Sequence, residues 1–102
     1  MIAATPPPAR VQVVAQEFSF TLSRLTIASG PAIVELVNRG EDAHDLRMKR
    51  ADGTRVYAWP TVQPGGHADR EYRLIPGTYV LWCSIANHRQ LGMTAKLIVK
   101  RR

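Results

Sequence analysis

Both the fold and the function of this chain can be approached from one stretch in which a strand-like segment runs into a loop. The stretch reads Tyr79-Val80-Leu81-Trp82-Cys83-Ser84-Ile85-Ala86-Asn87-His88-Arg89-Gln90-Leu91-Gly92-Met93. Aromatic and β-branched residues dominate its first half, which is typical of a strand. Its second half places the only cysteine of the chain in the pattern Cys-x4-His-x4-Met.

The ligand types in this loop predict a metal site. A thiolate (Cys83), an imidazole (His88) and a thioether (Met93) are ligands of a soft or borderline transition metal, and together they indicate copper. His44 offers a second imidazole from an earlier segment. Two imidazoles, one thiolate and a long axial thioether form the trigonal site of copper electron-transfer proteins, so we expect these four residues to hold one copper ion, as Cu(I) or Cu(II).

The rest of the chain alternates short apolar-polar segments with Gly and Pro turn signals. Strands are expected over 11–15, 18–22, 32–37, 46–48, 67–74, 78–83 and 94–99. Residues 56–59 fit either a strand or an irregular flap. Seven or eight short strands at this spacing predict an all-β fold, an antiparallel Greek-key β-sandwich or barrel.

Length and composition predict one domain. A chain of 102 residues can build a single core without a metal as an obligatory staple, so we expect it to fold without copper. The Pro-rich residues 1–9 are predicted to form a flexible leader, and residues 10–102 the single domain.

The charge balance predicts a negatively charged partner surface. Fourteen Lys and Arg against eight Asp and Glu give a net charge of +6, which can steer the chain toward an acidic protein, nucleic acid or anionic lipid. The basic residues are scattered and no nucleic-acid-binding module is recognisable, so nucleic acid is not expected. The terminal Lys100-Arg101-Arg102 run is predicted to be a solvated tail.

Several pieces together resemble the cupredoxins, the small blue copper proteins of the plastocyanin and azurin kind, over about residues 10 to 100. The matching pieces are residues 18–20, 36–46, 76–79 and the loop 83–93 with Gly92 before the methionine. The resemblance implies a cupredoxin-like fold, and it implies His44, Cys83, His88 and Met93 as the ligands of a type 1 copper site.

The resemblance also implies a function. We expect a monomer that shuttles one electron between a protein donor and a protein acceptor and is not an enzyme, with an acidic docking surface on the partner. His88 would reach the surface through an apolar patch to which Ile85, Ala86 and Leu91 contribute. The family works outside the cytoplasm, in the periplasm or at the outer face of a membrane, and the Pro-rich start is compatible with a membrane tether upstream.

One position departs from the family pattern. Asp45 follows the first histidine, where the family commonly has Asn or Ser. A carboxylate at this position can still accept backbone N–H bonds, and charge-assisted bonds are stronger than neutral ones. Its negative charge is expected to favour the oxidised metal and lower the reduction potential.

Other interpretations of the same residues remain open. The main rival is a copper carrier or storage module that uses the same ligands without shuttling electrons; a second is an interaction domain with a vestigial metal site. Zinc could occupy the Cys and two His, but the Irving–Williams order favours copper(II). A Cys-His nucleophile pair would leave Met93 unexplained.

For the remaining candidates the ordinary structural roles are expected. Met48 is predicted to belong to the core, and His67 to face solvent. Glu41 and Asp42 are predicted to be turn residues. Trp59 and Trp82 are predicted to be packing groups.

Overall fold

A computed structural model describes residues 7–102, which form nine strands and no helix. In chain order these are β1 (Ala9–Gln16), β2 (Ser19–Leu22), β3 (Thr26–Ala28), β4 (Gly30–Asn38), β5 (His44–Arg50), β6 (Val56–Val62), β7 (His67–Leu74), β8 (Gly77–Trp82) and β9 (Thr94–Lys100). The described residues accordingly include no helix that could cross a membrane.

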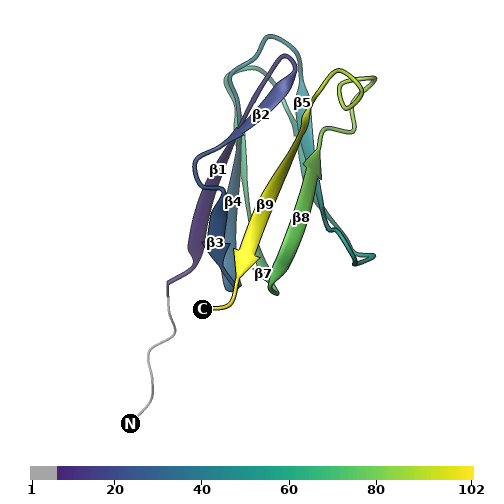
Figure 1. Cartoon of the computed structure of the whole chain (residues 1–102). Coiled ribbons are helices and arrows are strands. Elements are labelled where there is room, and N and C mark those ends of the chain that lie inside the picture. Colours follow the sequence, from purple (N-terminus) through teal and green to yellow (C-terminus); the bar gives the residue numbers. More distant parts are fainter. Residues whose placement is uncertain (1–6) are drawn as a thin grey trace.

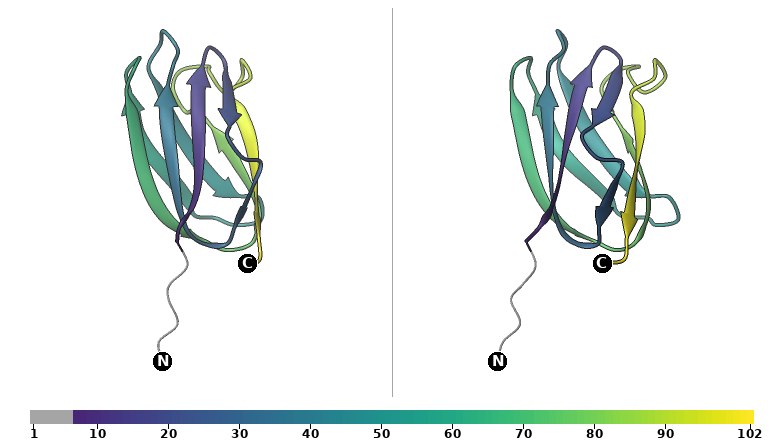
Figure 2. Two further views of the ribbon diagram at one scale, coloured as in Figure 1. Left: turned by 90° about the vertical axis from the view of Figure 1, so that its left-hand side faces the viewer. Right: turned by 60° about the vertical axis from the view of Figure 1, so that its left-hand side comes forward.

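The strands form two sheets that pack face to face (Figures 1 and 2). One sheet has the order β2-β1-β4-β7 and the other the order β3-β9-β8-β5-β6. This arrangement confirms the expected all-β sandwich. It also contains two parallel pairs, β1 with β4 and β3 with β9, so the sandwich is not antiparallel throughout.

Apolar residues at every second position explain the core. In β4, Ala32, Val34 and Leu36 are fully buried, while the residues between them are only partly so. Side chains of a strand alternate between its two faces, and the buried face of each sheet is turned toward the other. The indole N–H of Trp59 in β6 donates to the carbonyl of Val34 in the opposite sheet at 3.0 Å. Trp59 therefore packs and also links the two layers.

The predicted strands and the observed ones coincide closely, and three differences are informative. The ambiguous segment 56–59 lies in strand β6, and the short strand β3 is additional. Of the predicted leader, residues 1–6 lie outside the described residues, and β1 begins at Ala9.

The two ends of the sandwich carry different parts of the chain. The loop between β8 and β9 and the connection between β4 and β5 lie together at the upper end in Figure 1. Strand β1 begins and strand β9 finishes at the lower end (Figure 1). The site described next is built entirely at the upper end.

Candidate metal centre

His44 is the first residue of β5, and its imidazole is completely buried. Its Nε2 lies 2.9 Å from Oε1 of Glu17, and its Nδ1 is buried without any hydrogen-bond partner. An unpaired buried nitrogen is costly unless something binds it. Because a carboxylate accepts hydrogen bonds, Nε2 carries a proton, and in a neutral imidazole Nδ1 then has a free lone pair.

Strand β6 contains a bulge opposite the start of β5. His44 pairs with Val62 and Leu46 with Trp59, so the register shifts between them. The extra residue lies in β6, where Pro60 and Thr61 stand between Trp59 and Val62 and are both exposed. Strand β5 keeps its alternation, so His44 and Asp45 lie on opposite faces. Both are buried, and they make contacts on different sides of the site.

Cys83 and His88 both lie in the loop between β8 and β9, and their side chains approach His44. Cys83 directly follows β8, is fully buried and has no disulfide partner. Its Sγ lies 3.6 Å from Nδ1 of His88. Two ligands about 2.1 to 2.3 Å from one ion lie roughly 3.5 Å apart, so this separation suits a shared metal. Burial raises the pKa of the Cys83 thiol above its usual range, because the apolar surroundings disfavour a thiolate.

Turns fold the loop back so that Met93 returns to Cys83. The backbone N–H of Met93 donates to the carbonyl of His88 at 3.1 Å, and the N–H of Cys83 donates to the carbonyl of Met93 at 3.2 Å. Gly92 has φ of +117°, and a Cβ there would lie 3.2 Å from the carbonyl oxygen of Phe18. Glycine is therefore required just before the methionine, which is itself completely buried.

Asp45 ties β5 to the start of this loop. Its Oδ1 accepts a hydrogen bond from the backbone N–H of Ser84 at 2.7 Å, and its Oδ2 accepts one from the Ser84 hydroxyl. Arg47 lies 3.4 Å from the same carboxylate. The expectation that Asp45 accepts a backbone N–H bond is thus confirmed, and the bond is made to the residue that follows Cys83.

The structure therefore brings three of the predicted ligands to one point. One ligand atom from each of His44, Cys83 and His88 lies within 4.8 Å of the others. All three side chains are buried. The backbone of Met93 is hydrogen-bonded to the backbones of Cys83 and His88. Two nitrogens and one sulfur are a donor set for a soft or borderline metal, and the backbone bonds of the buried Met93 bring this residue next to Cys83 and His88. The unpaired Nδ1 of His44 fits the same conclusion.

Comparison with solved structures finds this fold among copper proteins. An auracyanin from the photosynthetic bacterium Roseiflexus castenholzii superposes with a TM-score of 0.75 at 17% identity, covering 93% of this chain and 99% of that one. Auracyanin A of Chloroflexus aurantiacus, described as a "blue" copper protein, gives 0.74 at 14% identity, covering 92% and 100%. A reduced amicyanin variant gives 0.68 at 18% identity, covering 94% and 86%.

The chain has the cupredoxin fold. Neither the comparison with protein-family models nor that with curated protein sequences found a match. The identity to the solved cupredoxins is low, so the site has to be judged on the residues of this chain.

Glu17 was not predicted from the sequence as a residue of this site. Oε1 of Glu17 accepts hydrogen bonds from the backbone N–H groups of Glu41 at 2.8 Å and Asp42 at 2.6 Å, besides its bond to His44. These two backbone bonds, with the His44 contact, lower the pKa of Glu17 from 4.5 to about 2. A Cβ at Gly40 would overlap the carboxylate, so the glycine leaves room for it.

No local pattern marks Glu17, because it lies in the turn between β1 and β2 and its partners are 24 or more residues away. Asn38, which is fully buried at the end of β4, is easier to recognise from the sequence than Glu17, because Asn is a typical turn residue. Its side chain bonds the carbonyls of Asp42 and Val62 and the N–H of Gly40, all at 2.8 Å. Glu17 and Asn38 together fix the connection that leads into His44.

The remaining candidates take their expected structural roles. Met48 is completely buried in β5, and Glu41 and Asp42 lie in the connection between β4 and β5. The His67 side chain is 64% exposed, with Nδ1 at 3.7 Å from Glu35 and 3.6 Å from Asp69. These three side chains form a polar cluster on β4 and β7 that shares no residue with the metal centre.

Proposed function

We propose that the chain is a mononuclear type 1 copper protein that transfers single electrons, with His44, Cys83, His88 and Met93 as the copper ligands. The observation that carries this proposal is the buried donor set, above all the unpaired Nδ1 of His44 beside Cys83 and His88. When bound, copper supplies the one-electron change between Cu(I) and Cu(II). The solved structures that share the fold, among them the "blue" copper protein auracyanin A, support the same function.

The protein's contribution is to hold the ligands before the ion arrives. Glu17 fixes the orientation and tautomer of His44 through Nε2, and Asp45 anchors the residue after Cys83. Partners of this kind orient the ligands of a metal site and tune its properties. A site whose ligands are held by hydrogen bonds from both sheets changes little between oxidation states, which favours fast electron transfer.

His88 provides the route to the surface. Its side chain is 8% exposed, and its ring lies 4.9 Å from that of Phe18 and 5.0 Å from that of His44. Leu91, which is 50% exposed, and the partly buried Ile85 lie in the same loop. We infer that a redox partner docks on this apolar rim and exchanges electrons through the His88 ring.

A protein donor and a protein acceptor follow from this function, and a location outside the cytoplasm follows from the family resemblance. The net charge of +6 supports an acidic partner, which Arg89 beside His88 can meet. Its guanidinium lies 4.8 Å from the centre of the Trp82 ring, which holds it at the rim. Association with such a partner would slow as salt rises, and an unchanged rate would exclude it.

A copper carrier is the second candidate, and the burial of all four side chains favours a resident ion over one that is released. Protein-film voltammetry separates the two functions. An electron carrier gives a reversible one-electron wave with fast exchange and keeps its copper during cycling. A carrier of ions would lose copper to a soluble Cu(I) chelator within a few cycles, and that result would overturn the proposal.

A further inference from the structure

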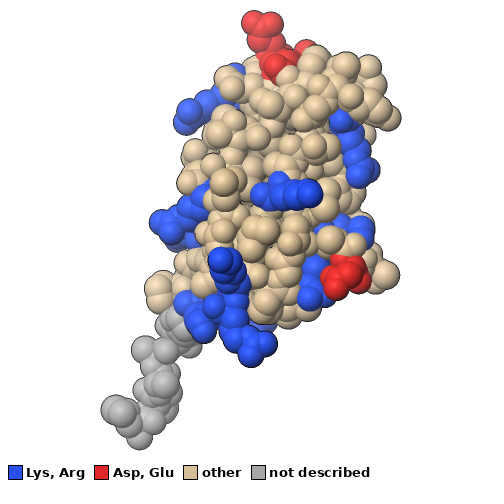
Figure 3. All heavy atoms as spheres, viewed as in Figure 1, with Lys and Arg blue, Asp and Glu red and all other residues tan. Residues whose placement is uncertain are grey.

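Charge is distributed unevenly along the long axis of the molecule. The acidic residues Glu17, Glu41 and Asp42 lie at the upper end with the metal centre. In Figure 3 acidic groups appear at the top of the molecule and at its lower right, and basic groups are spread over this face with a cluster at its lower end. This basic cluster lies at the end of the molecule opposite to the metal centre.

The basic groups of the lower end enclose one open pocket of about 370 Å³. Its lining contains five cationic side chains and no Asp or Glu of the described chain. The basic surface, as we call this group, consists of Arg10, Arg24, Lys100, Arg101 and Arg102. Cations this close repel one another, and an anion in the pocket would relieve the repulsion.

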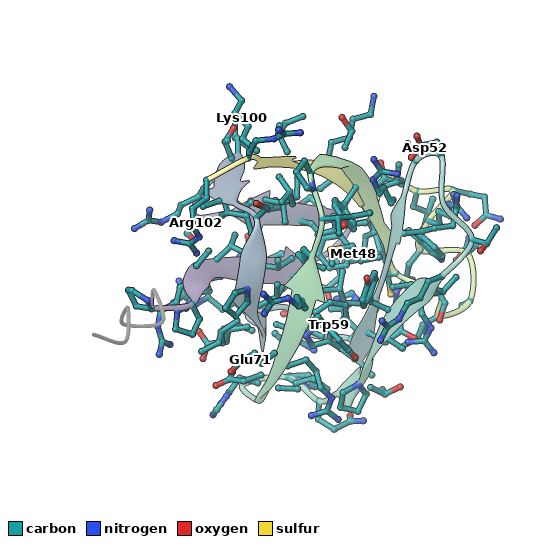
Figure 4. All side chains as sticks on the ribbon, turned by 90° about the horizontal axis from the view of Figure 1, so that it is seen from below. Met48, Asp52, Trp59, Glu71, Lys100 and Arg102 are labelled. Atoms are coloured by element: carbon teal, nitrogen blue, oxygen red, sulfur yellow. The ribbon has the colours of Figure 1, made fainter. Side chains whose placement is uncertain are left out.

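Backbone contacts hold this surface in place. Strand β3 pairs with β9 so that Ala28 lies opposite Lys100, and the N–H of Ser29 donates to the Lys100 carbonyl at 2.7 Å. The Arg102 guanidinium donates from Nε to the carbonyl of Ser29 at 3.1 Å. The terminal run is exposed, as expected of a tail, but it is attached to the turn between β3 and β4. Figure 4 shows Lys100 and Arg102 at the outer edge, with Met48 and Trp59 inside the sandwich.

Exposed aliphatic side chains accompany the basic ones. Leu25, which follows Arg24, is 70% exposed, and Ile75 in the turn between β7 and β8 is 58% exposed. Lys and Arg side chains beside exposed aliphatic ones are characteristic of proteins that bind at an anionic bilayer surface. A single-stranded nucleic acid would instead call for aromatic groups that stack on its bases, and the described residues that line the pocket include none.

We propose that the basic surface binds the phosphate groups of an anionic lipid bilayer. The basic surface lies at the end opposite to the metal centre, so a molecule bound through it is oriented with the metal centre pointing away from the bilayer. Strands β1 and β9 meet the bilayer at their lower ends, and the His88 rim stays open to a redox partner. This inference goes beyond the proposed electron transfer and does not depend on it, because no member of the basic surface touches the metal ligands.

Vesicle co-sedimentation of the whole chain at low and moderate salt tests the proposal. Binding is compared between vesicles of pure phosphatidylcholine and vesicles containing phosphatidylglycerol. The test variant is Arg10→Gln/Arg24→Gln/Lys100→Gln. The matched control, Arg39→Gln/Arg70→Gln/Lys96→Gln, removes the same charge from exposed positions outside the pocket. Thermal unfolding of each variant establishes that it is folded.

We expect binding only to the anionic vesicles. Each Lys or Arg near such a surface strengthens binding about fivefold, so the test variant should bind about a hundredfold more weakly than the control. Equal binding by the two variants would overturn the proposal, because net charge alone would then account for it. Binding to a DNA oligonucleotide or to free inorganic phosphate, with none to the vesicles, would overturn it as well. The Cys83→Ser chain should bind vesicles like the native one, so failure of the copper proposal remains distinguishable.

Discussion

Two carboxylates act on His44 and Cys83 from outside the donor set. Glu17 bonds the far nitrogen of His44, and Asp45 bonds the backbone just after Cys83. Neither belongs to the four predicted ligands, yet each fixes one of them. At the scale of single residues, the properties of the site therefore depend on two side chains that carry negative charge.

Replacing Glu17 should release the His44 ring. In the metal-free protein Glu17→Ala is expected to give a mixture of His44 tautomers, whereas Glu17→Gln keeps an oxygen acceptor and the Nε2–H form. Two-dimensional nitrogen NMR of the imidazoles measures this directly. Glu41→Ala, at an exposed neighbouring position, is the control and should match the native spectrum. A single unchanged tautomer in Glu17→Ala would show that the carboxylate does not orient the ring.

Replacing Asp45 by Asn should raise the reduction potential of the copper-loaded protein. The amide still accepts the Ser84 N–H bond, but the buried negative charge that stabilises Cu(II) is gone. We expect a rise on the order of 60 mV, which for one electron is a tenfold change in equilibrium constant. Voltammetry of Asp52→Asn, whose side chain is 76% exposed at a distant turn, should show no shift. A lower or unchanged potential in Asp45→Asn would contradict the argument.

At the scale of elements, the metal-binding loop depends on the glycine before Met93. Gly92 and Gly65 both have positive φ, +117° and +83°, but only Gly92 has a backbone oxygen close to the position of a Cβ. Gly65→Ala should lower the free energy of unfolding by about 1 kcal/mol, because of its positive φ alone. Gly92→Ala should lower it by more. Urea unfolding of the metal-free variants measures both. If the two variants lost equal stability, the close approach to the Phe18 carbonyl would not contribute to the effect of Gly92→Ala.

Strand β8 should make stability depend on pH in the alkaline range. Burial raises the pKa of Tyr79 above 10.0, and its hydroxyl donates to the carbonyl of Ile75 at 2.9 Å. In the unfolded chain the phenol ionises first, so the stabilisation is complete below pH 10 and is lost as pH rises through the folded-state pKa.

Urea unfolding at pH 8 and pH 11 checks this prediction. Native protein and Tyr72→Phe, which keeps the buried Tyr79 hydroxyl, should both lose stability at pH 11. Tyr79→Phe should lose about 1 kcal/mol at pH 8, the usual value of one hydrogen bond, and show a smaller further loss at pH 11. An equal pH dependence in all three proteins would rule out Tyr79 as its source.

The strands and the loop that carries Cys83, His88 and Met93 could be predicted because both rest on local patterns. Alternation marked β4 and β9, and the spacing of Cys83, His88 and Met93 marked the loop. The parallel pairing of β1 with β4 and the role of Glu17 could not be predicted, because they arise from contacts between distant segments. The bulge in β6 between Trp59 and Val62 likewise breaks the alternation on which sequence patterns depend.

At the scale of the whole molecule, the two ends of the sandwich serve different purposes. The upper end assembles the buried, proposed metal ligands from β5 and the loop before β9, and the lower end presents the basic surface. Twenty buried apolar residues of the described part, 7–102, connect the two ends through one continuous core. Since that core does not include the metal itself, the chain should fold before copper binds, and the site should exist in the metal-free protein.

Titration of the folded, metal-free protein with copper(II), followed by visible absorption, tests the central claim most directly. We predict an intense thiolate-to-copper band that saturates at one equivalent and is lost in Cys83→Ser, while Met48→Leu, a change to the buried methionine of β5, keeps it. A protein that binds one copper ion and stays colourless, or a Cys83→Ser variant that keeps the band, would contradict the claim.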